Sequence, residues 1–265
     1  MSELSPVYGP VHSWRFGNSL GIDMIVERST CSFNCVYCQL GHIQDITAKQ
    51  RVFVPTAEIV AALEKVDWNN VDVVTFSGSG EPTLALNIDE VIHTIRQRWN
   101  KPVMILTNST LLRDPATRRR LYEATTIACK LDAADDATLQ KVNRPADGIT
   151  LDTIVEGIAS LRPDGYKGTI ALQCMFLPTN RAEAERIASI AARVQPDEIH
   201  LNTPRRPYPR SWYLEARGNH NPDAPVPTIQ LKTISLEEAR EIESVIRNAV
   251  PGAKVLSVYR DAPAA

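Results

Sequence analysis

Short apolar runs alternate with helix-forming stretches along most of the chain, and this alternation limits the fold more than any other feature. Continuous runs rich in Val and Ile are typical of strands buried on both faces, as in a parallel sheet. A strand–helix repeat therefore predicts an α/β fold with helices outside a parallel sheet. The six predicted strands are Leu20–Val26, Val71–Ser77, Pro102–Asn108, Thr126–Ala133, Thr169–Leu177 and Glu198–Thr203.

The number of repeats indicates how far the sheet curls. About six strand–helix units in a chain of 265 residues predict a partial (β/α)6 TIM-like barrel rather than a closed eight-stranded one. The last helix has the clearest start, because Ser235-Leu-Glu-Glu238 has the pattern of a capping box. The same helix is expected to stop at Pro251-Gly252.

Two parts of the chain are expected. Residues 1–203 are predicted to form the barrel core with an N-terminal extension. Residues 204–265 are predicted to add a Pro-rich segment that covers one end of the barrel, and then a helix and strand that pack on it. Within this second part, Arg205–Arg210 mixes basic groups with Tyr208 and lies near Trp212, a set suited either to phosphate or base contact or to a packed lid.

Charge and apolar content exclude several function classes. The net charge of -2 argues against a dedicated nucleic-acid binder. The sequence contains no run of about 18 apolar residues, so no membrane span is expected. Its first ten residues lack a secretory signal pattern, which predicts a cytoplasmic location. Five cysteines are too few for a disulfide scaffold, and their odd number also argues against one.

Three of those cysteines, Cys31, Cys35 and Cys38, fall within eight residues after the first predicted strand. Chemistry in parallel α/β folds sits at the carboxyl ends of strands, so this loop is the expected active site. Thiolates ligate zinc or iron–sulfur clusters, and three of them leave one iron of a cubane cluster open. The alternative is a zinc site, with His42 as the fourth ligand, in a zinc-stabilised RNA-binding module.

The stretch "CSFNCVYC" resembles the Cys-x3-Cys-x2-Cys signature of the radical S-adenosylmethionine (SAM) superfamily, including the aromatic Tyr37 before the last cysteine. The resemblance implies a radical SAM barrel, a [4Fe-4S] cluster held by the three cysteines, and SAM on the open iron. It also implies an oxidoreductase-type reaction in which reductive cleavage of SAM yields a 5′-deoxyadenosyl radical. A flavodoxin or ferredoxin is the implied electron donor.

A second motif supports the resemblance. "TFSGSGEPTL" after the second predicted strand is similar to the superfamily's Gly-Gly-Glu-Pro motif, which binds the SAM ammonium group. Gly78, Gly80 and Glu81 match it, whereas Ser79 replaces the usual first glycine of the pair. Strand ends at "LTNST", "CKLDAADD" and "LQCMFL" resemble SAM-contacting strands of relatives. The expected cofactor-binding residues are therefore Tyr37, Gly78, Ser79, Gly80, Glu81, Asn108, Asp132, Gln173 and Asn202.

Four residues on the fourth and fifth predicted strands are candidates for catalysis. Lys130 and Asp132 share one face of a strand, and a charged pair on an apolar strand is either an active-site pair or a strand-end ion pair. Cys129 and Cys174 are either small buried hydrophobes or, if they point into the barrel, donors of a hydrogen atom to a substrate radical.

The substrate class is open. "KVNRP" and "IHLNTPRRP" resemble proteins similar to wyosine-forming tRNA synthetases, and "TNSTLL" is similar to activating enzymes that place a glycyl radical on a partner protein. True wyosine synthetases carry a second cluster, and no cysteine precedes Cys31 here. We therefore expect a protein partner or a small molecule as substrate, with tRNA modification as the alternative.

Overall fold

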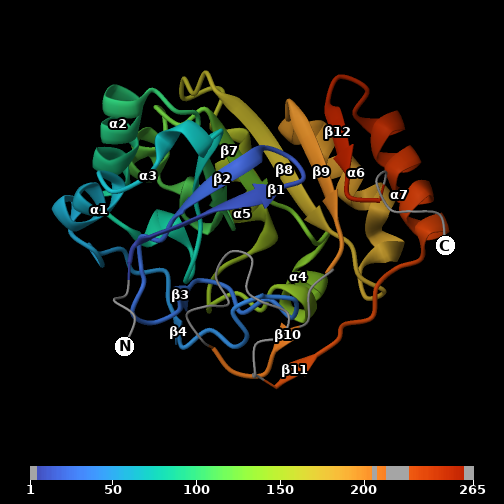
Figure 1. Ribbon diagram of the computed structural model, residues 1–265. Helices are drawn as coiled ribbons and strands as arrows, with labels where there is room; N and C mark the ends of the chain where they lie inside the picture. Colours follow the sequence, from blue (N-terminus) through green and yellow to red (C-terminus); the bar gives the residue numbers. More distant parts are fainter. Residues whose placement is uncertain (1–4, 205–207, 213–226, 260–265) are drawn as a thin grey trace.

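The computed structural model describes residues 5–204, 208–212 and 227–259 and has one main sheet of eight strands, shown in Figure 1. Only the pairing of β1 with β2 is antiparallel, and every other pair in this sheet is parallel. The curled, open sheet confirms the predicted partial barrel. In spatial order its strands are β1 (Val7–Ser13), β2 (Gly17–Ile22), β5 (Val73–Phe76), β6 (Val103–Thr107), β7 (Thr126–Lys130), β8 (Thr169–Met175), β9 (Glu198–Asn202) and β12 (Lys254–Ser257).

The six predicted strands correspond to β2 and β5 to β9. Each edge of the sheet carries one further strand: β1 was not predicted, whereas β12 lies in the C-terminal region where a strand was expected. β1 forms an antiparallel hairpin with β2, and β12 pairs with β9. The added edges extend the six-stranded half-barrel to eight strands without changing its parallel centre.

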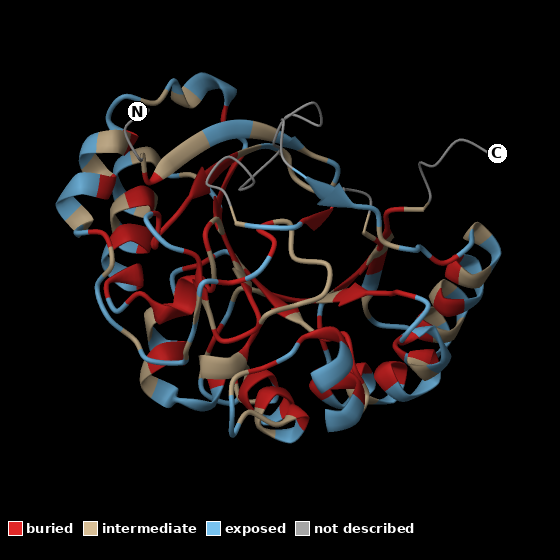
Figure 2. Ribbon diagram, turned by 90° about the horizontal axis from the view of Figure 1, so that it is seen from below, coloured by how far each residue is buried: buried red, intermediate tan, exposed pale blue. Residues whose placement is uncertain are grey.

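Helices surround the sheet with their buried sides turned inward (Figure 2). Ser235 caps the last of them as the sequence predicts, because its hydroxyl accepts from Glu238 N at 3.1 Å while Glu238 accepts from Ser235 N at 2.7 Å. The apolar stripes of the helices pack against the outward faces of the strands and form one large core. The helices are α1 (Thr56–Leu63), α2 (Ile88–Trp99), α3 (Pro115–Arg120), α4 (Asp136–Val142), α5 (Leu151–Ala159), α6 (Ala184–Val194) and α7 (Leu236–Ala249).

Short elements gather at one end of the sheet, where β3, β4, β10, β11 and α4 lie together in Figure 1. β3 (Thr30–Cys31) and β4 (Asp45–Ile46) belong to the loop that carries the cysteines. β10 (Tyr208–Pro209) and β11 (Thr228–Ile229) form a two-stranded pair. Single 3-10 turns complete the fold: η1 (Trp68–Asn70), η2 (Pro82–Leu84), η3 (Thr110–Arg113) and η4 (Arg181–Glu183).

The described part of the Pro-rich segment lies against the cysteine loop. A Cβ at Gly41 would come within 2.8 Å of the Pro209 carbonyl oxygen, and Trp212 packs with Leu40 and Ile43. Further along, α7 packs on α6 and β12 extends the sheet. Residues 205–207 of the Arg205–Arg210 motif lie outside the described residues, so its proposed contact with phosphate or a base stays a prediction.

None of the helices within the described ranges combines the length and apolar character needed to cross a membrane.

Candidate active site

The three clustered cysteines lie in the loop after β2, at the carboxyl end of the parallel strands. Cys31 ends β3, and two turns place the others: Cys38 N donates to Cys35 O at 3.1 Å, and Gly41 N donates to Cys38 O at 2.9 Å. All three are half-buried free thiols. Burial, and to a smaller extent the nearby Cys38, raise the pKa of Cys35 to about 12. A bound metal centre would favour the thiolates that such burial otherwise disfavours.

Side-chain amides donate to two of these sulfurs. Asn108 Nδ2 lies 3.4 Å from Cys31 Sγ, and Asn143 Nδ2 lies 3.4 Å from Cys35 Sγ. The backbone N–H of Phe33 also donates to Cys31 Sγ at 3.4 Å. Hydrogen bonds to sulfur tune the reduction potential of iron–sulfur clusters. Three thiols with N–H donors around them are a donor set that fits such a cluster.

The zinc alternative needs a fourth ligand on a single ion. Within the described ranges, no three His, Cys, Asp or Glu side chains, the three cysteines included, converge on one metal ion, so His42 is judged by its own contacts. His42 Nδ1 lies 3.4 Å from Asn34 Nδ2, and its ring packs edge-on against Tyr208 with the centroids 6.4 Å apart. These contacts give His42 a packing role in the loop.

The glycine motif after β5 holds the cysteine loop in place. Thr30 N donates to Ser79 O at 2.9 Å, and Glu81 N donates to Thr30 O at 3.1 Å. Gly80, with φ +156°, lies so close to Thr30 that an added Cβ would be 1.7 Å from the Thr30 carbonyl oxygen. Gly78, with φ +124°, would place a Cβ 2.5 Å from Asp23 Cγ. Both positions therefore require glycine.

Ser79 is fully buried, and its hydroxyl explains why serine replaces glycine here. Ser79 Oγ donates to Asp23 Oδ2 at 2.6 Å, while Asp23 Oδ1 accepts from the backbone N–H groups of Ile25 and Val26, both at 3.0 Å. The serine side chain thus braces the start of the cysteine loop, and only its backbone is placed for a ligand. Asp23 was missed in the sequence analysis because it lies inside the predicted strand Leu20–Val26, whereas β2 ends one residue earlier, at Ile22.

Glu81 also serves as a brace. Its buried carboxylate accepts from Thr83 N, Thr83 Oγ1, Thr107 Oγ1 and Asn108 N at 2.7–3.1 Å. Burial raises its pKa, and these four hydrogen bonds act in the opposite direction. Three of these donors bond Oε1 and only Asn108 N bonds Oε2, so Oε2 keeps a lone-pair site that a ligand could use. Its contribution to the site is to fix the ends of β5 and β6 relative to each other.

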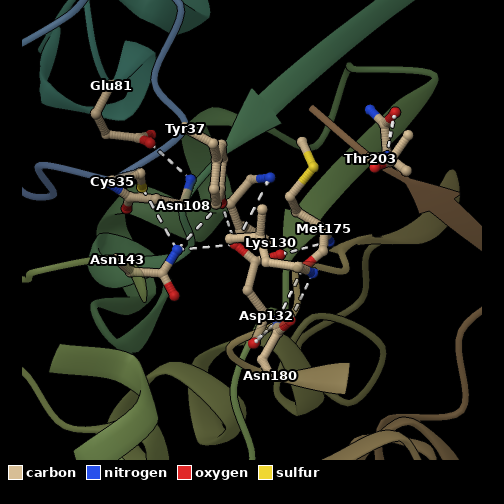
Figure 3. Close-up of polar contacts among 12 residues, drawn as sticks. Cys35, Tyr37, Glu81, Asn108, Lys130, Asp132, Asn143, Met175, Asn180 and Thr203 are labelled. Atoms are coloured by element: carbon tan, nitrogen blue, oxygen red, sulfur yellow. Dashed lines mark hydrogen bonds and ion pairs between the residues drawn. The ribbon is translucent and has the colours of Figure 1, made fainter. Parts of the chain in front are cut away.

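Tyr37, Asp132 and Asn143 form the polar centre of the site (Figure 3). Tyr37 OH donates to Asp132 Oδ2, which also accepts from Asn143 Nδ2 at 2.8 Å. The other oxygen, Asp132 Oδ1, accepts from Met175 N at 2.7 Å. Lys130 Nζ lies 3.8 Å from Asp132 Oδ2 and 5.1 Å from the Tyr37 ring centroid. The network ties the cysteine motif to the ends of β7 and β8.

The predicted Lys130–Asp132 pair is thus a strand-end ion pair, and it also contacts the cysteine motif. Asp132 is further held through its carbonyl oxygen, which accepts from Asn180 Nδ2 at 2.7 Å. Asn143 is the second site residue that the sequence analysis missed. It belongs to "KVNRP", which was recognised as a motif, but nothing in the local spacing links it to Cys35.

The side chains of Cys129 and Cys174 point away from the barrel interior. Strand register places Lys130 beside Gln173, and Cys129 and Cys174 alternate with them on the opposite, helix-facing side. Both thiols are fully buried in the hydrophobic core, and burial raises the pKa of Cys129 to about 12. Their placement favours a packing role and argues against the hydrogen-atom-donor hypothesis.

We therefore predict that Cys129→Ala and Cys174→Ala leave the rate of SAM cleavage unchanged, because neither thiol reaches the barrel interior. Each should lower the free energy of unfolding by about 1 kcal/mol, since each removes a buried group of roughly methyl size. 5′-Deoxyadenosine formation and urea unfolding measure the two effects. Loss of turnover in a variant that retains its stability would restore the catalytic hypothesis.

Gln173 and Asn202 lie on the inner side of β8 and β9. Gln173 Nε2 is buried without a hydrogen-bond partner among the described residues. Asn202 lines the barrel cavity, and its Oδ1 accepts from Thr203 N at 2.9 Å. Among the described residues, the Gln173 amide N–H2 group is therefore available to a ligand.

Asn143 offers a direct test of the sulfur contacts. Asn143→Ala removes the N–H donor to Cys35, so we predict a more negative reduction potential for the cluster and about a tenfold loss of activity. Potentiometric titration followed by electron paramagnetic resonance measures the potential. An unchanged potential would show that the Asn143 amide does not tune the cluster.

The model for the radical SAM superfamily matches residues 29–191, more than half of the chain. The chain therefore belongs to the radical SAM superfamily, whose members are enzymes that use a [4Fe-4S] cluster and SAM. Within it, the chain is 42% identical over 247 residues to the UPF0026 protein slr1464 of Synechocystis sp., covering 92% of this chain and 93% of that protein. The chain is thus a member of the UPF0026 proteins. Membership of the radical SAM superfamily favours an iron–sulfur enzyme over the alternative of a zinc-stabilised RNA-binding module.

Solved structures share the fold at low sequence identity. The crystal structure of Streptococcus suis SuiB bound to precursor peptide SuiA gives a TM-score of 0.62 at 15% identity, covering 88% of this chain and 47% of SuiB. TYW1 with a lysine-pyruvate adduct bound gives 0.60 at 13% identity, covering 89% of this chain and 75% of TYW1. The chain therefore spans about half the length of SuiB. These similarities confirm the barrel.

Proposed function

We propose that Cys31, Cys35 and Cys38 hold the [4Fe-4S] cluster, and that this chain uses it with SAM to abstract hydrogen from a substrate inside the barrel. The observation that carries the proposal is the docking of the cysteine loop on the glycine motif through Thr30. Two backbone hydrogen bonds at 2.9 and 3.1 Å hold the loop against Ser79 and Glu81. The same arrangement supports a site where a cluster and the amino-acid end of SAM lie side by side.

When bound, the cluster and SAM supply a one-electron cleavage that gives a 5′-deoxyadenosyl radical. The chain holds the cluster through three thiolates, and Asn108 and Asn143 stabilise negative charge on two of them. The Tyr37–Asp132 hydrogen bond orients the turn before Cys38. The barrel wall excludes water from the reacting carbon, which protects a reactive intermediate from side reactions.

The strand ends are proposed to bind SAM. The Gly78–Glu81 backbone would contact its ammonium group, and the Tyr37 backbone and Asn202 its adenine. Gln173 would reach the ribose or carboxylate, because its amide N–H2 group is unpaired among the described residues. The polar groups of Asn108 and Asp132 already bind protein partners. We therefore assign these two residues mainly to orienting the site.

The remaining partners are a reductant and a substrate. A flavodoxin or ferredoxin is the proposed electron donor, because the reaction needs one electron from outside the chain. A small molecule fits the barrel cavity of about 320 Å³, which is the lower end of the range for ligand pockets. A partner protein or tRNA would instead have to place one residue or base at the strand ends.

The experiment is anoxic reconstitution with iron and sulfide, followed by dithionite and SAM. We expect the broad absorbance of a [4Fe-4S] cluster and the formation of 5′-deoxyadenosine. A matched sample without dithionite controls for hydrolysis of SAM. A protein that binds the cluster but forms no 5′-deoxyadenosine under reduction would contradict the proposed function.

A further inference from the structure

The barrel cavity extends away from the cysteine loop to the β1–β2 hairpin. Tyr37 lines one end, and Trp14, Arg15 and Phe16 from the hairpin turn line the other. The turn precedes Gly17, where β2 begins, whereas the cysteine loop follows Ile22, where β2 ends. At about 3.3 Å per residue, these ends lie roughly 17 Å apart along the strand. The hairpin turn thus forms the floor of the cavity, opposite the candidate active site.

Arg15 supplies an unpaired cation at this floor. Its Nε and Nη1 atoms are buried and have no hydrogen-bond partner among the described residues. The guanidinium rests on the rings of Trp14 and Phe16, with Cζ 5.1 and 5.4 Å from their centroids. These rings contact the face of the guanidinium and leave its N–H donors free. Burial lowers the pKa of Arg15 to about 10, so it stays charged at neutral pH.

The surroundings of Arg15 do not neutralise it. His200 packs on Phe16 with the ring centroids 5.6 Å apart. Burial lowers the pKa of His200 to about 4, and the charge of Arg15 acts in the same direction, so the imidazole is neutral. His200 Nε2 contacts Glu198 Oε2 at 2.9 Å, and that carboxylate also contacts Lys254. Glu198 is therefore already paired, and no carboxylate in the part of the chain that the structure describes forms an ion pair with the guanidinium.

Two guanidinium N–H groups buried without a partner are costly for a folded protein, which points to a ligand that supplies the missing contacts. Because a guanidinium presents its N–H groups as a planar fork, it suits carboxylate and phosphate oxygens. Hydroxyl groups of Ser19 and Thr75, hydrogen-bonded to each other at 2.7 Å, line the same cavity and add polar contacts. The floor therefore has the chemistry of an anion site.

We infer that Arg15 binds the carboxylate or phosphate group of a small-molecule substrate that lies along the cavity with its reacting carbon toward Tyr37. The inference rests on the proposed function and narrows its substrate to small anionic molecules. Arg15 would determine which molecules bind in the cavity. The distance from Arg15 to the strand ends would determine which carbon of the substrate meets the radical. Arg15 is thus a specificity-determining residue far from the cluster.

Isothermal titration of the cluster-loaded protein at low ionic strength tests the site, with inorganic phosphate in one arm and acetate in the other. We expect the wild-type protein to bind at least one probe, and the stronger arm identifies the anion class. Arg15→Gln should weaken that binding about tenfold or more, because a charge-assisted hydrogen bond is lost. Arg240→Gln, which alters an exposed arginine on α7, should leave binding unchanged.

Arg15→Lys keeps the charge and loses the fork, so it should bind the probe with intermediate affinity. If circular dichroism shows Arg15→Gln to be unfolded, the lysine variant decides the result. Wild-type protein that binds neither probe, or Arg15 variants with wild-type affinity, would overturn the inference. The proposed function is judged separately by 5′-deoxyadenosine formation in the wild-type protein, so failure of one is distinguishable from failure of the other.

Discussion

We expect Cys35→Ala to abolish 5′-deoxyadenosine formation and to prevent assembly of the cluster. Cys35 is the middle of the three proposed thiolate ligands, and its sulfur accepts a hydrogen bond from Asn143. With only two thiolates left, the cubane would be held at two corners and exposed to solvent. Iron and sulfide content after anoxic reconstitution measures assembly, and chromatography of the reduced reaction with SAM measures turnover. Cys31→Ala and Cys38→Ala should give the same result.

Cys174→Ala is the matched control, because it removes a thiol that lies in the core away from the loop. It should assemble the cluster and cleave SAM at the wild-type rate. A Cys35→Ala protein that still held a full complement of iron would show that Cys35 is not a ligand. The three-cysteine assignment would then have to be abandoned.

Gly80→Ala is expected to displace the cysteine loop while leaving the barrel folded. The added Cβ would lie 1.7 Å from the Thr30 carbonyl oxygen, and φ at this position is +156°. Overpacking and backbone strain together should cost at least about 2 kcal/mol of unfolding free energy. Because a shift of about 1 Å at an active site can cost a hundredfold in rate, SAM cleavage should fall by roughly that factor.

Gly165→Ala controls for backbone strain alone. Gly165 also has a left-handed conformation, with φ +106°, but an added Cβ would meet no atom within 4 Å. The substitution should cost about 1–2 kcal/mol of stability and leave SAM cleavage unchanged. Urea unfolding and 5′-deoxyadenosine formation separate the two variants. Equal activities of Gly80→Ala and Gly165→Ala would show that close contact with Thr30 does not position the cysteines.

The central strands were predictable because each is buried on both faces and reads as a continuous apolar run, as in β5. The edges carry weaker signals. β1 contains Gly9 and Pro10 and is only half-buried, so its sequence resembles a loop. β12 is four residues long and begins with an exposed lysine. Both strands form on the free edge of a neighbouring strand, so the sequence predicted a strand after the last helix but not its pairing with β9, and it did not predict β1.

The candidate site was predictable where its chemistry is local. The three cysteines and the glycine motif are short patterns whose spacing indicates their role. Asn143 reaches Cys35 across 108 positions of the chain, and Arg15 lines the cavity because the turn of the β1–β2 hairpin lies at its far end. The sequence also suggested a ligand role for the Glu81 carboxylate, which stays a prediction; its four hydrogen bonds to protein donors could not be read from the motif.

Electron paramagnetic resonance of the anoxic, dithionite-reduced protein, recorded before and after SAM is added, tests the three-thiolate centre most directly. A cluster with one open iron predicts a reduced [4Fe-4S] signal whose g-values shift when the SAM amino and carboxylate groups bind that iron. A signal that SAM leaves unchanged would contradict a cluster with one open iron. A colourless protein that contains zinc and gives no signal would contradict it too.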